Sequence, residues 1–259
     1  DVYKRQVLEY VPDNVSPNGI KWVNEHLNLD AKIKDFLLTF KPAAPMPFCG
    51  VDCGFEIQFN YSGLNVSDIK TLPPATGLAG KFFLGQNEIR VSSKDGSLSK
   101  QSASNINVRL DELFSTGETF VYIDTEATGP AAEVVQHIKK MVPDSKIPPL
   151  EGNHTSHVKL KMSTRKEKQD DIRYDVSSTL TDLKLVIPEG ERSLKAEKAE
   201  FNGRNGYSYF KSEAAILEDM PVSLVWSLEK KDDDEHQVLE LKGEETPEIL
   251  LREIPETVA

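Results

Sequence analysis

The stretch TGPAAEVVQHIKKMVPDSKIPPLEGNHTSHVKLKM, residues 128–162, carries the patterns of a helix, a turn and a strand in succession. After Pro130, apolar residues recur at spacings of three and four, which is typical of one face of a helix. Pro143 ends this helix, and the turn at Pro148-Pro149 cannot continue it. Residues 158–162 then alternate apolar residues with lysines, which predicts a long, half-buried strand.

The same kind of helix start occurs on both sides of this stretch. Ser16-Pro17 and Thr246-Pro247 each precede an apolar pattern with helical spacing, so the three starts lie about 115 residues apart. We therefore predict one segment, 1–259, of a larger protein, with repeat units at roughly 17–129 and 130–246 and a third beginning at 247–259. Coincidence is the alternative, because only the turn and helix-start residues repeat.

Strict alternation of apolar and polar residues dominates the rest of the chain. It is clearest at 55–61, where Phe, Ile, Phe and Tyr alternate with Glu, Gln and Asn. Short turns, such as Asp95-Gly96, are predicted to join the strands into a meander. The sequence predicts a mostly β fold, an elongated and twisted antiparallel sheet curled into an open groove, with short helices between repeats. Further strands are predicted at 33–40, 78–84, 88–91, 106–110, 120–123, 174–180, 183–187, 194–201, 207–217 and 222–228.

Composition excludes some partners. The formal net charge of -11 opposes binding to nucleic-acid phosphates and to anionic headgroups, so we expect no nucleic-acid partner. No window approaches the roughly 18 consecutive apolar residues of a membrane span.

Residues that could carry chemistry are few. His154 and His157 are three apart on a predicted strand, so they point to opposite faces and do not suggest a metal site. Cys49 and Cys53 fit either a local disulfide or two free thiols. The sequence contains no phosphate-binding loop, nucleophile elbow or distinct pair of carboxylates. We expect no catalysis, no cofactor and no metal.

Three short motifs resemble the AsmA-like domain of the YhdP/TamB-type bridge-like lipid transfer proteins. They are VLEYVP at 7–12, LPPATGLAG at 72–80 and DMPVSLVW at 219–226. The resemblance implies a periplasmic segment of a protein anchored in the inner membrane of a Gram-negative bacterium. Its sheet would conduct phospholipids between the inner and outer membranes, and it would reach both membranes through parts of the protein outside this chain. The resemblance implies no catalytic residues.

In this interpretation the apolar strand faces line one continuous channel for phospholipid acyl chains, whereas Glu56, Gln58, Lys159 and Lys161 face water. Two alternatives are a closed β-sandwich, as a binding or structural module of the cell envelope, and a hydrolase with dispersed active-site residues. A contiguous exposed apolar strip would distinguish the groove from the sandwich. The predicted lining residues are Phe36, Leu38, Phe40, Phe55, Ile57, Phe59, Val158, Leu160, Met162, Leu183, Leu185, Val222, Leu224 and Trp226.

Overall fold

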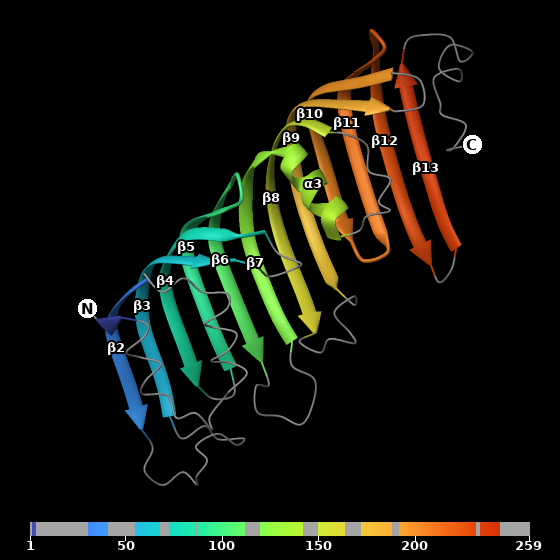
Figure 1. Cartoon of the computed structure of the whole chain (residues 1–259). Coiled ribbons are helices and arrows are strands. Elements are labelled where there is room, and N and C mark those ends of the chain that lie inside the picture. The colour runs from blue at the N-terminus through green and yellow to red at the C-terminus, as the bar shows by residue number, and fades with distance from the viewer. Residues whose placement is uncertain are drawn as a thin grey trace. The chain divides into compact units, whose positions relative to one another are not determined.

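The computed structural model consists mainly of β-strands (Figure 1). The structure describes residues 2–3, 31–40, 55–67, 73–85, 88–111, 120–141, 150–163, 172–187, 192–231 and 234–243. The strands are hydrogen-bonded in the order in which they occur in the chain, β1 to β13, in an open sheet. The prediction of a mostly β, antiparallel meander is therefore confirmed.

The chain divides into two compact units. Unit 1 comprises Asp1–Glu126 and Lys159–Arg173, and unit 2 comprises Ala127–Val158 and Tyr174–Ala259. The predicted repeats at 17–129 and 130–246 stay a prediction. The predicted helix starts at Pro17 and Pro247 and the pair Cys49 and Cys53 lie outside the described residues.

Unit 1 contains six strands in full, and every pairing between neighbours is antiparallel. Three strands contribute residues to both units: β7 (Phe120–Pro130), β8 (Leu150–Ser163) and β9 (Arg173–Ile187), of which only Arg173 belongs to unit 1. The six strands are β1 (Val2–Tyr3), β2 (Lys32–Phe40), β3 (Phe55–Val66), β4 (Ala75–Gly85), β5 (Glu88–Leu98) and β6 (Gln101–Asp111).

Unit 2 contains the one helix of the described residues, four complete strands and all of β9 except Arg173, and these five strands also pair antiparallel. The helix α3 (Ala131–Met141) follows Pro130 directly, as predicted, and Ala131 and Val135 are buried on one face of it. The strands are β9 (Arg173–Ile187), β10 (Arg192–Arg204), β11 (Tyr207–Leu217), β12 (Met220–Lys231) and β13 (Asp234–Gly243).

Two local predictions are wrong. Asp95-Gly96 lies inside β5, and the chain turns at Ser99-Lys100 instead. A Cβ atom at Gly96 would lie 2.4 Å from a methyl carbon of Leu78, so another residue there would require this side chain to move. The stretches 174–180 and 183–187 form one strand, β9, because Asp182 adopts a positive φ of 52° that bends the strand without ending it.

These bends recur in neighbouring strands. In β9, β10 and β11 two consecutive residues are exposed between buried ones, and the pairs are Thr181 and Asp182, Glu197 and Lys198, and Glu213 and Ala214. The register places these three exposed pairs side by side. The pairing of β11 with β12 has a bulge at the same place, between Ser212 and Ala215. In unit 1, positive φ occurs at Asp35, Gly63, Gly77 and Asn105 in four of the strands. In β9, β10 and β11 the same face of the strand is buried before and after the exposed pair.

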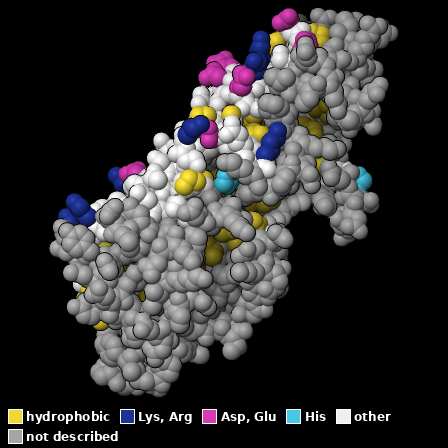
Figure 2. Space-filling view, viewed as in Figure 1, with side chains coloured by type: hydrophobic (Ala, Val, Ile, Leu, Met, Phe, Trp, Pro, Cys, Tyr) yellow, Lys and Arg dark blue, Asp and Glu magenta, His cyan; other side chains and the backbone are white. Residues whose placement is uncertain are grey.

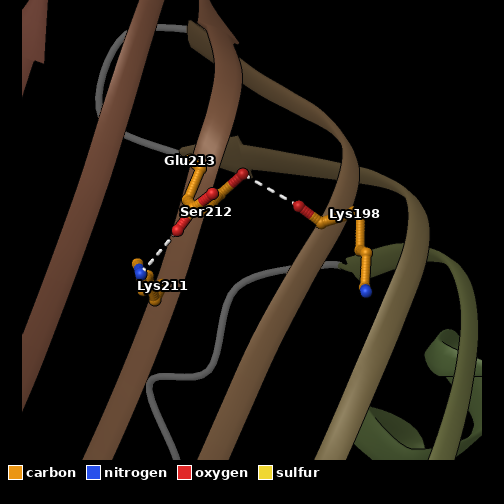
Figure 3. Close-up of polar contacts among 4 residues, drawn as sticks. All are labelled: Lys198, Lys211, Ser212 and Glu213. Atoms are coloured by element: carbon orange, nitrogen blue, oxygen red, sulfur yellow. Dashed lines mark hydrogen bonds and ion pairs between the residues drawn. The ribbon is translucent and has the colours of Figure 1, made fainter.

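Hydroxyl groups bond to backbone carbonyls beside these bends. The Ser212 hydroxyl donates to the carbonyl of Lys198 on the neighbouring strand at 2.9 Å, while Lys211 and Glu213 form an ion pair (Figure 3). In unit 1 the Ser93 hydroxyl has the same role, because it is 2.9 Å from the carbonyl of Ala79 and accepts the N–H of Ala79 at 3.0 Å. Such side-chain hydrogen bonds satisfy backbone groups that have no partner in the neighbouring strand where the pairing is interrupted.

Candidate functional site

Four of the predicted lining residues of β2 and β3 lie on one face of unit 1, namely Phe36, Leu38, Ile57 and Phe59. Leu38 is the register partner of Ile57. Phe40 is the partner of Phe55, but the side chains of this second pair lie outside the part that the structure describes. The ring of Phe36 stacks on that of Phe59 with centroids 6.3 Å apart. This face is called the apolar face of unit 1 below.

The apolar face extends over β4, β5 and β6, whose residues were not among the predicted lining residues. The register places Ile57 opposite Leu84, and Phe59 opposite Phe82, whose rings stack at 4.6 Å. Alternation with polar residues did not mark Phe82 and Leu84, because Phe83 stands between them. The register continues the row through Ile89, Val91, Val108 and Leu110.

The predicted lining residues of unit 2 also share one face. Leu183 and Val222 belong to a buried core, and Leu185 and Leu224 pack against it. The register places Trp226 opposite Phe210, another residue that packs against this core.

The predicted residues of β8 are divided between the units. Val158 belongs to unit 2, whereas Leu160 and Met162 belong to unit 1, and all three are half-buried. Whether the two apolar faces form one continuous channel stays a prediction.

The predicted lining residues of the two units differ in the exposed fraction of their side chains. Phe36 and Leu38 on unit 1 are 42% and 51% exposed, whereas Leu183 and Val222 in unit 2 are 2% and 4% exposed. In the space-filling view, hydrophobic side chains of the described residues lie in recesses of the surface and many charged ones stand out from it (Figure 2). Unit 1 therefore offers the more accessible apolar surface.

A polar cluster lies on β8 and β9 of unit 2. His154 is buried, and its Nδ1 atom is 2.7 Å from the Ser156 hydroxyl, which is 2.6 Å from that of Ser178. The Nε2 atom of His154 is buried without a hydrogen-bond partner. Burial lowers the pKa of His154, because desolvation disfavours the charged ring. His157 is exposed, so the two histidines do face opposite ways.

The opposite side of unit 1 is called its polar face below. Gln58 and Lys159 are exposed there, but Lys161 is only half-exposed. Its ammonium lies 4.0 Å from the ring centroid of Phe120 and 5.3 Å from that of Tyr122. The polar face thus includes aromatic rings that support cations.

Neither a metal site nor a membrane-spanning helix is found in the described part of the chain. No group of three or more His, Cys, Asp or Glu residues within those ranges could hold a metal ion. The helix that the structure describes is not long and apolar enough to cross a bilayer. Comparisons of the chain with protein-family models, curated proteins and solved structures find no match.

Proposed function

We propose that this chain is a periplasmic, non-catalytic segment of an AsmA-like bridge protein that conducts phospholipids between the inner and outer membranes. The acyl chains would lie on the apolar face of unit 1, and the membranes would be reached through parts of the protein outside this chain. The full-length protein would be anchored in the inner membrane of a Gram-negative bacterium.

The supporting observation is the exposure of large side chains on one sheet face. Phe36 and Leu38 are about half exposed and share this face with half-buried Ile57, Phe59 and Phe82. Covering such a surface with acyl chains is favourable by about 25 cal/mol per Å2 of apolar area removed from water. An extended row of this kind fits a chain-like apolar ligand better than a compact polar one.

The test compares neighbouring positions on opposite faces of the same strand. A photoreactive amino acid is placed at Ile57 or Gln58 of β3, and in a second pair at Leu38 or Leu37 of β2. Gln58 is exposed and Leu37 is 54% exposed, so simple accessibility would favour labelling of the controls. We expect phospholipid crosslinks at Ile57 and Leu38 and few at Gln58 and Leu37, in the purified chain and in cells.

A second experiment places a charge on the apolar face and measures lipid passage. Ile57→Asp should reduce both the bound phospholipid and lipid passage in the full-length protein, because an unpaired carboxylate is costly to desolvate among acyl chains. Gln58→Asp is the matched control. Equal labelling on both faces, or undisturbed lipid passage with Ile57→Asp, would refute the proposal and favour a closed module whose apolar residues pack on one another.

A further inference from the structure

The polar face of unit 1 holds two arginines in fixed positions on aromatic rings. The guanidinium carbon of Arg90 lies 4.4 Å from the ring centroid of Phe83, and that of Arg109 lies 4.7 Å from the ring centroid of Tyr122. Stacking on a ring restricts a guanidinium group and leaves its N–H donors free to point sideways. The two side chains remain 57% and 50% exposed, so a ligand in solution can reach them.

The two arginines are also direct neighbours across the sheet. Arg90 is the register partner of Arg109, and Glu88 is the partner of Asp111. The ion pairs therefore run along the strands, Arg90 to Glu88 at 3.2 Å and Arg109 to Asp111 at 3.0 Å. Like charges directly opposite one another destabilise a sheet, and this arrangement places two such pairs side by side.

A hollow of about 720 Å3 in unit 1 surrounds the arginine pair. Its charged lining consists of four cations against one acid, although the whole chain has a net charge of -11. The lining cations are Lys81, Arg90, Arg109 and Lys159, and the acid is Asp124.

The corresponding hollow in unit 2 provides a comparison. Three lysines and three acids line it, so its charges balance. The hollow in unit 2 therefore does not share the cationic excess of the hollow around the arginine pair.

An anion between the arginines would remove the unfavourable pairing. Exposed ion pairs such as those to Glu88 and Asp111 contribute little free energy, so they compete weakly with a ligand. A phosphate group has enough oxygens to accept two parallel bonds from one guanidinium and further bonds from the other.

We propose that Arg90 and Arg109 bind the phosphate group of a phosphate ester on the polar face of unit 1. Lys81 and Lys159 supply additional positive charge at the hollow. The two arginines lie on the sheet face opposite to the apolar one, so phosphate binding can be tested separately from acyl-chain binding.

The test is calorimetric titration of the purified chain with inorganic phosphate and with glycerol 3-phosphate at low ionic strength. The double variant Arg90→Gln/Arg109→Gln should bind both ligands at least 10-fold more weakly, as expected for the loss of charge-assisted bonds. Arg90→Lys/Arg109→Lys should give intermediate affinity, because it keeps the charge and loses the forked donors. Arg204→Gln is the matched control, since Arg204 stacks on Tyr207 at 5.4 Å in unit 2, away from this hollow.

Sedimentation with vesicles distinguishes the two sources of a phosphate ester. Binding to phosphatidylglycerol vesicles that the double glutamine variant loses would assign a lipid headgroup, whereas binding of glycerol 3-phosphate alone would assign a soluble ester. The absence of phosphate binding by the unmodified chain would overturn the proposal. Equal weakening by Arg204→Gln would overturn it as well, because the effect would then reflect net charge only.

Discussion

At the scale of single residues, His154 is a buried ionisable group with one nitrogen lacking a partner. Its pKa in the folded protein lies below the usual 6.5, whereas the unfolded chain takes up a proton near that value. Below pH 6.5 the unfolded state therefore binds more protons at His154 than the folded state does. As a result, the free energy of unfolding decreases as the pH falls below 6.5, whereas above that pH His154 does not reduce it. The group therefore penalises folding in mild acid.

We predict that His154→Gln makes the free energy of unfolding less dependent on pH between about 7.5 and 5.5. Glutamine keeps a polar group near the Ser156 hydroxyl and cannot take up the proton. The measurement is urea unfolding at a series of pH values, followed by far-ultraviolet circular dichroism. An unchanged slope for His154→Gln, compared with the unmodified chain, would contradict the prediction.

At the scale of the strand, Gly80 in β4 shows how closely neighbouring backbones approach. Its register partner is Tyr61, whose hydroxyl passes over it and donates to the carbonyl of Ser92 at 3.0 Å. A Cβ atom on Gly80 would lie 1.8 Å from that same carbonyl oxygen. The backbone therefore has to shift to accept any other residue.

We predict that Gly80→Ala lowers the free energy of unfolding by about 3 kcal/mol, because a methyl group cannot be accommodated without moving β5. Gly77→Ala in the same strand should cost about 1 kcal/mol, because it adds only the strain of a positive φ in open space. Urea unfolding of the two variants measures the difference. Equal losses would show that the close approach at Gly80 does not determine the stability of this part of the sheet.

Much of the strand pattern could be predicted because alternation is a local signal. The bends could not, since Asp35, Asn105 and Asp182 adopt positive φ although glycine is the usual residue there. In retrospect, the two consecutive polar residues Glu197 and Lys198 were a sign of one bend. The register between strands was also not predictable, and it alone places Arg90 opposite Arg109.

The candidate site was predicted in part, because alternation indicates which residues of one strand share a face but not how the strands are paired. Alternation assigned Ile57 and Phe59 to one face of β3 and Gln58 to the other, and the register joins that face to Leu38. Alternation could not show that Leu183 is enclosed by its own neighbours while Phe36 stays exposed, because burial depends on side chains from several strands.

At the scale of the whole molecule, the apolar surface of unit 1 should be detectable in the folded protein. We predict that the chain binds a hydrophobic fluorescent dye without denaturant, and that the double variant Phe36→Ser/Leu38→Ser reduces the fluorescence at least twofold. The reason is that both side chains are exposed on the apolar face, where they add to a contiguous strip.

Leu37→Ser is the matched control for this measurement. Leu37 is 54% exposed, slightly more than Leu38, but it pairs with Gln58 on the polar face. An equal reduction by Leu37→Ser would show that the dye responds to scattered apolar residues and not to one face. Circular dichroism of each variant verifies that the strand content is unchanged.

The sequential pairing of the strands also has a consequence for how the sheet folds. Within each unit a strand pairs with the one synthesised just before it, from β2 with β3 to β12 with β13. Among the described strands with a printed register, each pairs with its neighbour in the sequence, and short-range pairing of this kind closes small loops at low entropic cost. The sheet can therefore grow hairpin by hairpin from any strand pair that forms first. Until the following strand pairs with it, the last strand of the growing sheet has backbone groups available for pairing, so at that stage its edge can also pair with another chain.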